Sequence, residues 1–113
     1  MIRRVGSRAT FAALAGAARH TRGPVTVRCV AGSRGGPPRV AHAVGRGTGS
    51  AVARNRVRRR LRAAVAACEG KLERGAAYLV SAGREALTMP FGELVDTLAE
   101  LFEAARREAR AWR

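Results

Sequence analysis

The residues most able to do chemistry are the arginines in one short stretch, AVARNRVRRRLRAAV, at residues 51–65. Six Arg and one Asn occupy seven of its nine central positions, 54–62. A guanidinium group holds phosphate oxygens through two parallel hydrogen bonds, and it also stacks on flat aromatic groups. This stretch therefore predicts recognition of a polyanion.

The same stretch has the periodicity of a helix with one buried side. Its apolar residues recur at i, i+4, i+7, i+8 and i+11, within about 100° of arc, and they are Val57, Leu61, Ala64, Val65 and Cys68. Away from that stripe lie Arg56, Arg59, Arg60 and Arg62, with Arg54 and Arg58 nearer its edge. Because a disordered basic tag has no such periodicity of apolar residues, we expect a helix packed on a core. An anionic partner would relieve the repulsion among its like charges, a few tenths of a kcal/mol per close pair.

The charge of the whole chain points to the same kind of partner. The formal net charge is +14 over 113 residues, and residues 1–68 contain 15 Arg but no Asp or Glu. Residues 69–113 sum to −1, so the positive charge lies in the N-terminal two-thirds. We expect a nucleic acid to bind there. An anionic membrane surface is the weaker alternative, and no apolar stretch approaches the length of a membrane span.

The sequence shows no residue pattern typical of catalysis by the polypeptide itself. The basic half has no carboxylates for metal binding or acid–base work. His20 and His42 are separated by a predicted strand, and Ser50 and Ser81 lack the surroundings of an activated nucleophile. The glycines of residues 45–49 are followed by no Lys-Ser or Lys-Thr pair, as a phosphate-binding loop requires. We expect a binding protein with no catalytic residue and no metal site of its own.

Short elements must position the arginine helix. After a tail at residues 1–6, Ser7 is a suitable N-cap for a helix over about 8–18, with Phe11, Leu14, Ala15 and Ala18 on one face. An alternative for residues 1–20 is a signal or transit peptide, because they combine arginines with an alanine-rich run. We favour a helix of the domain, because Gly16 breaks the run and the acid-free composition continues far beyond it.

The rest of the chain predicts strands and a second amphipathic helix. Alternating or continuous apolar runs predict strands at 25–31, 39–45 and 76–82, with turns at 32–38 and 45–51. A final helix is expected over about 89–111, where apolar residues repeat at three, four and seven: Phe91, Leu94, Val95, Leu98, Leu101, Phe102 and Ala105. That face is interpreted as packing. The order α-β-β-(β)-α-β-α predicts one α/β domain over residues 1–113. Cys29 and Cys68 lack CxxC spacing, which favours a reduced, intracellular setting.

The arginine helix also carries a family resemblance. The run Arg54-Asn55-Arg56-Val57-Arg58-Arg59, preceded by the segment at 45–52, resembles the Arg-Asn-Arg signature of the bacterial ribonuclease P protein family. The resemblance extends over roughly residues 3–108 and agrees with the order of elements. It implies an α+β two-layer sandwich, ribosomal protein S5 domain 2-like, with a left-handed βαβ crossover that the periodicities do not predict.

The function that the resemblance implies is a ribonucleoprotein that removes the 5′ leader from precursor tRNA. The RNA subunit holds the Mg²⁺ and does the chemistry in the bacterial cytoplasm, and no obligate protein partner is expected. The implied contacts with the catalytic RNA are Arg54, Asn55, Arg56, Arg58, Arg59, Arg60 and Arg62. The implied contacts with the single-stranded leader, between the first helix and the sheet, are Arg8, Phe11, Arg28 and Arg46.

The chain departs from the family pattern near the expected leader cleft. Gly45 and Gly47 stand where relatives have Ser and Lys, and Arg28 stands where they often have an aromatic. Gly83-Arg84 replaces the usual pair after the last strand. With aromatics at only 4%, leader binding is expected to depend on arginine contacts more than on stacking. The alternatives are a ribosomal or other general RNA-binding protein and a DNA-compacting protein.

Overall fold

The fold was analysed in a computed structural model that describes residues 1–32 and 35–109, and the backbone of residues 111–112. Its α-helices are α1 (Arg8–Ala15), α2 (Ala51–Ala67) and α3 (Phe91–Glu108). Its strands are β1 (Arg3–Arg4), β2 (His20–Arg22), β3 (Val25–Gly32), β4 (Arg39–Ala43), β5 (Ala77–Ala82) and β6 (Ala111–Trp112). Short 3-10 helices are η1 (Arg46–Thr48), η2 (Glu69–Lys71) and η3 (Arg84–Leu87).

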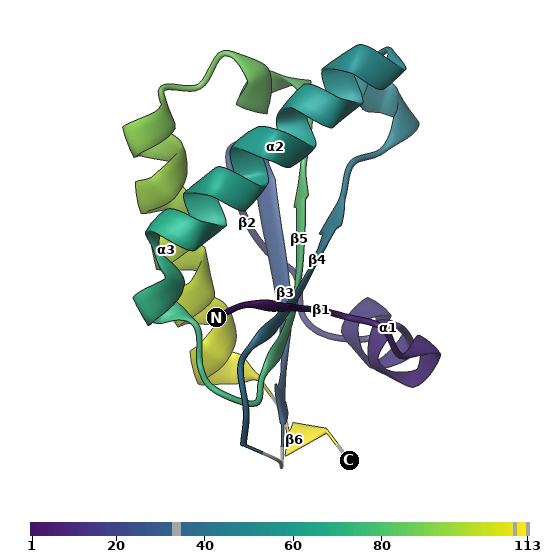
Figure 1. The fold of residues 1–113 in the computed structure, drawn as a ribbon, viewed down its shortest axis with the longest axis vertical. Helices are drawn as coiled ribbons and strands as arrows, with labels where there is room; N and C mark the ends of the chain where they lie inside the picture. The colour runs from purple at the N-terminus through teal and green to yellow at the C-terminus, as the bar shows by residue number, and fades with distance from the viewer. Residues whose placement is uncertain (33–34, 110, 113) are drawn as a thin grey trace.

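The sheet is mixed, with the strand order β1-β4-β5-β3-β2. β4 runs parallel to both β1 and β5, whereas β3 runs antiparallel to β5 and β2. β6 pairs with the end of β3. The helices α2 and α3 cover one face of this sheet, and the short α1 lies against the other face (Figure 1). The predicted α/β fold and its main element order are confirmed.

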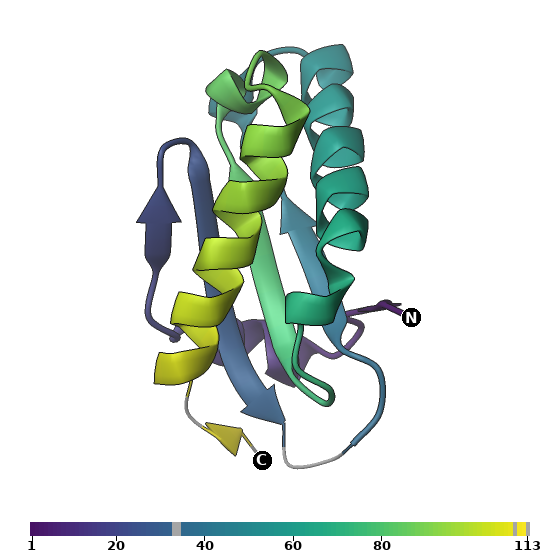
Figure 2. The same ribbon diagram turned by 90° about the vertical axis from the view of Figure 1, so that its left-hand side faces the viewer.

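The connection from β4 through α2 to β5 has the unusual hand. Figure 2 views the sheet from the side that α2 and α3 cover, and there β5 lies to the left of the parallel β4. A right-handed crossover would place β5 to the right, so this crossover is left-handed, in contrast to about 98% of such units. The return strand β5 thereby lies between β4 and β3, at the centre of the sheet.

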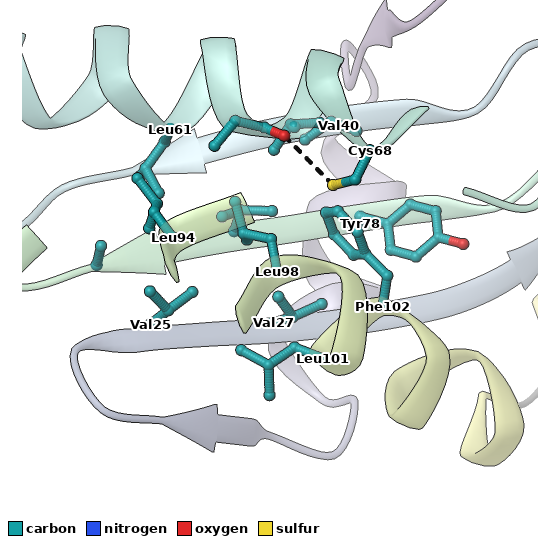
Figure 3. Packing of buried hydrophobic residues seen from close by; sticks show 14 of the residues in the cluster. Val25, Val27, Val40, Leu61, Cys68, Tyr78, Leu94, Leu98, Leu101 and Phe102 are labelled. Carbon is teal, nitrogen blue, oxygen red and sulfur yellow. Dashed lines mark hydrogen bonds between the residues drawn. The ribbon is translucent and has the colours of Figure 1, made fainter. Parts of the chain in front are cut away.

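The main core lies between the sheet and the two long helices (Figure 3). Leu61 of α2 and Leu98 of α3 are fully buried there, as the apolar periodicity predicted. Tyr78 and Phe102 pack edge to face with ring centroids 5.2 Å apart, and the Tyr78 hydroxyl accepts a 2.9 Å hydrogen bond from the backbone N–H of Glu73. A smaller cluster under α1 consists of Val5, Leu14, Val30 and Ala77.

Local signals explain where the helices and the first hairpin begin. The Ser7 hydroxyl accepts a hydrogen bond from the Thr10 N–H at 3.3 Å, which confirms the predicted N-cap of α1. Ser50 caps α2 in the same way, through the Ala53 N–H at 3.2 Å. Between β2 and β3 the chain turns at Gly23, whose φ of +56° favours glycine.

Several predicted helix and strand boundaries differ from those in the structure. The tail at 1–6 contains β1, whose partner β4 is distant in sequence, and residues 20–22, for which no strand was predicted, form β2 in a tight hairpin with β3. α1 ends at Ala15 instead of residue 18, with Gly16 as its C-cap. α3 ends at Glu108 instead of residue 111, and residues 111–112 pair with β3. Part of the predicted turn at 32–38, residues 33–34, lies outside the described residues.

Two aromatic side chains face away from the core, and for Phe91 this contradicts the predicted packing face. Phe11 and Phe91 were both assigned to apolar faces, yet each side chain is 42% exposed. In α1 the core instead receives Thr10 and Leu14, because the helix is rotated so that Phe11 and Ala15 point outward. Phe91 is the first residue of α3, one turn before the first fully buried residue, Leu94.

Candidate nucleic-acid interface

The outer surface of α2 is the strongest candidate for binding a polyanion. Val57 and Leu61 are fully buried and fix the rotation of the helix. The opposite side chains, which we call the arginine face, are exposed, and they are Asn55, Arg56, Arg59 and Arg62. Figure 1 shows α2 running diagonally across the upper part of the molecule. The predicted orientation of these residues is confirmed.

The acids of the described residues do not neutralise this surface. Glu100 of α3 pairs with Arg22 of β2, and Glu103 pairs with Lys71 at 3.4 Å. Glu108 lies 3.7 Å from His20. Within the described residues, no arginine of α2 forms an ion pair with an acid. The positive charge of α2 therefore remains available to a partner.

Other arginines of α2 are held by the protein itself. Arg54 donates to the Gly49 carbonyl at 3.2 Å, and Arg58 donates to Asn55 Oδ1 at 3.1 Å. Arg60 reaches across to the segment before α3, where it donates to the Ala86 carbonyl at 3.0 Å and also to the Met89 carbonyl. Of the predicted RNA contacts, Arg60 is thus the one most engaged in holding the fold.

A basic groove of about 560 Å³, which we call the edge groove, lies beside the arginine face. It is lined by Ile2, Arg3, Arg4, Val5, Phe11, Val40, Ala41, His42, Arg62, Val65 and Ala66. The groove joins one predicted leader contact, Phe11, to one predicted RNA-subunit contact, Arg62. β1 passes between α1 and α2 here, as Figure 1 shows. No acid lines this groove, so its apolar floor and basic rim suit a nucleotide.

His42 is an unusual residue in the edge groove. Its Nε2 is buried and has no hydrogen-bond partner within the described residues. Burial, and secondarily the positive charge of Arg62, lower the pKa of His42 from 6.5 to about 4. The imidazole is therefore neutral at physiological pH and adds no charge to the groove.

The other predicted leader contacts are dispersed. Arg28 on β3 donates to the Ala15 carbonyl at 2.7 Å, which anchors the end of α1 to the sheet. Arg8 is exposed in the first turn of α1, and Arg46 is exposed in η1. None of the three lines the edge groove with Phe11.

Sequence reasoning missed Arg3, Arg4 and the position of His42 in this groove. The available signal was the acid-free composition of the N-terminal residues, which marked them as basic without saying what they face. Their placement depends on the parallel pairing of β1 with β4, Arg3 opposite Arg39 and Arg4 opposite Val40. A two-residue strand carries too short a pattern to predict such a pairing.

The remaining reactive groups offer no site for covalent or metal chemistry. Cys29 and Cys68 are buried free thiols; burial raises the pKa of Cys29 to about 12 and also raises the pKa of Cys68. No cluster of three or more His, Cys, Asp or Glu side chains that could hold a metal ion occurs in residues 1–32 and 35–109. Likewise, no helix in the described part of the chain is long and apolar enough to cross a membrane.

Comparisons with known proteins agree on one family. A family model described as Ribonuclease P matches residues 2–106. The ribonuclease P protein component of Symbiobacterium thermophilum is 48% identical over 71 residues, which cover 63% of this chain. That match spans 62% of the relative's own length.

Solved structures show the same fold at lower identity. The RNase P protein of Staphylococcus aureus matches with a TM-score of 0.72 and 18% identity, covering 93% of this chain and 96% of that one. The RNase P protein of Thermotoga maritima matches with a TM-score of 0.75 and 18% identity, covering 89% of this chain and 96% of that one. These similarities show that the arrangement of helices and strands is shared.

Proposed function

The chain belongs to the ribonuclease P protein family, and on that premise we propose that it is the protein subunit of a ribonucleoprotein that removes the 5′ leader from precursor tRNA. The observation that carries this proposal is the arginine face of α2, exposed on a helix whose inner side is locked in the core. Family membership indicates an RNA subunit as the partner, and the geometry indicates the arginine face as the surface that binds it.

The arginine face is assigned to the catalytic RNA. Arg56, Arg59 and Arg62 project from one rigid helix without an acidic partner in the described residues, so they can reach successive backbone phosphates. Such contacts position an RNA without reading its sequence. Asn55 shares this face and can bond a base edge or a ribose hydroxyl.

The edge groove and α1 are assigned to the single-stranded leader. The exposed Phe11 ring offers a stacking surface for a base, a contact of about 1–3 kcal/mol. Arg3, Arg4 and Arg62 surround it and can neutralise phosphates on either side. Because Arg62 belongs to both surfaces, leader and catalytic RNA would lie next to each other on the protein.

Bond cleavage is assigned to the RNA subunit. The described residues offer no clustered carboxylates or imidazoles to hold a metal ion, and their two cysteines are buried thiols with raised pKa values. The Mg²⁺ ions that this reaction uses would be held by RNA phosphates. The role of this chain is to bind and orient the two RNAs.

Reconstitution tests the proposal directly. The purified protein is mixed with a bacterial ribonuclease P RNA and a precursor tRNA at a low Mg²⁺ concentration where the RNA alone is nearly inactive. We expect the protein to restore cleavage at the correct 5′ position and to show no activity without the RNA.

Two controls define the result. A double variant, Arg56→Ala with Arg59→Ala, should lose rescue while keeping the helical circular dichroism of the wild type. Tight binding to many RNAs, without rescue of cleavage by the cognate ribonuclease P RNA, would contradict the proposal and favour a general RNA-binding protein.

A further inference from the structure

A second groove lies on the other side of α2, against the start of α3. This α2–α3 groove has a volume of about 650 Å³, within the range of about 300–1,000 Å³ found for small-ligand sites. It is lined by Arg56, Arg59, Arg60, Ala63, Leu87, Thr88 and Phe91. It shares no lining residue with the edge groove, so the two hollows flank the arginine face.

Phe91 gives the α2–α3 groove an aromatic surface. Its side chain is 42% exposed, although the rest of the apolar stripe of α3 is largely buried. The ring precedes the first fully buried residue of the helix, Leu94, by one turn, so the main core has no place for it. An exposed ring beside arginines is the combination that stacks unpaired nucleobases.

The position of Phe91 is held by Arg60. The guanidinium group of Arg60 donates to the carbonyls of Ala86 and Met89, the latter two residues before the ring. These bonds fix the segment between η3 and α3 against α2. They hold the backbone at the start of α3 beside α2, which lowers the entropy lost when a ligand binds there.

The charges of the α2–α3 groove favour a nucleic acid over a protein. Arg56 and Arg59 are exposed and make no hydrogen bond or ion pair within the described residues, and no acid lines the groove. Both residues also belong to the arginine face, so an RNA on that face continues directly into the groove.

We propose that the α2–α3 groove binds one unpaired nucleotide of the catalytic RNA, with its base stacked on Phe91 and its phosphates held by Arg56 and Arg59. This inference rests on the proposed function and extends it, because it makes the start of α3 part of the RNA interface. The groove selects a flipped-out or single-stranded nucleotide, since a base within a duplex exposes no face for stacking.

The test compares two substitutions at one position. The Kd of the full-length protein for the catalytic RNA is measured for wild type, Phe91→Leu and Phe91→Trp, with thermal unfolding of each. Leu keeps an apolar side chain but removes the aromatic face, so we expect Kd to rise about 5- to 100-fold, as loss of one stacked base predicts. Trp keeps the aromatic face and should retain affinity near that of the wild type.

The outcomes separate the two proposals. Wild-type protein that binds the catalytic RNA no better than an unrelated RNA of equal length would overturn the proposed function. Specific wild-type binding with an unchanged Kd for Phe91→Leu would overturn only the stacking inference. An equal rise in Kd for Phe91→Leu and Phe91→Trp would also overturn the stacking inference, because it would mean that binding requires the shape of Phe and not an aromatic face.

Discussion

At the scale of single residues, arginines of the same helix differ in what they do. Arg56 and Arg59 face solvent without a partner in the described chain, whereas Arg60 holds two backbone carbonyls before α3. Arg28, on β3, anchors the end of α1. A count of arginines therefore overstates the number available to RNA, and the contacts of each guanidinium decide its role.

His42 makes the stability of the protein depend on pH. Its pKa is lowered to about 4 in the folded protein but lies near 6.5 in an unfolded chain. Below pH 6.5 the unfolded state therefore binds more protons, so stability is lost as the pH falls from 6.5 to 4 and levels off below. We expect a loss on the order of 2 kcal/mol, since partial exposure of the ring reduces the full effect.

The measurement is the free energy of unfolding at a series of pH values for wild type and His42→Leu. Carboxylates titrate in both proteins, so the difference between the two curves isolates His42. Stability of the variant should fall less between pH 6.5 and 4. Parallel curves through this window would show that His42 is protonated in the folded protein as readily as in the unfolded chain.

At the scale of elements, α2 separates binding from stability on its two sides. Arg56→Ala or Arg59→Ala should raise the Kd for the catalytic RNA roughly 5- to 30-fold, as loss of a contact of about 1–2 kcal/mol predicts. Neither residue touches the apolar stripe, so helical circular dichroism and the unfolding temperature should stay unchanged.

Arg60→Ala is the control for Arg56→Ala and Arg59→Ala, because it removes an arginine of the same helix that contacts the protein itself. It removes hydrogen bonds to two carbonyls, so we expect a loss of about 1–3 kcal/mol in the free energy of unfolding. A stable Arg60→Ala protein, or loss of helical signal in Arg56→Ala, would show that the structure assigns these side chains to the wrong roles.

At the scale of the whole molecule, the chain separates its charges along the sequence and in space. Residues 1–68 hold 15 Arg and no acid, and they supply α1, α2 and every residue that lines the edge groove. Glu100 and Glu103 of α3 pair with Arg22 and Lys71, which are outside the arginine face. The result is a large positive surface that attracts RNA over a distance.

Leader binding should therefore depend strongly on salt. If arginine–phosphate contacts dominate, about five neutralised phosphates give a slope near −3.5 for log K against log salt concentration. The measurement is the affinity for a short single-stranded leader RNA over a series of salt concentrations. A slope near −1 would instead mean that stacking on Phe11 provides most of the affinity.

Local patterns in the sequence determined the arginine helix, its buried stripe and the three main strands, and they predicted a polyanionic partner. These follow from residue types and from the periods of 3.6 and 2, which are properties of neighbouring residues. The same reasoning placed Phe91 in the core, because a helical wheel gives the phase of a stripe but not how far along the helix the core extends.

Only the tertiary structure decided which side chains meet. β1 depends on a partner strand distant in sequence, and the left-handed crossover depends on packing of the whole sheet. The edge groove joins Arg3, Phe11 and Arg62 from three elements, and the α2–α3 groove joins Arg59 to Phe91. Such contacts form between segments whose separation along the chain carries no periodic signal. The sequence thus predicted a polyanionic partner, and the fold decided which side chains lie together on the surface proposed to bind it.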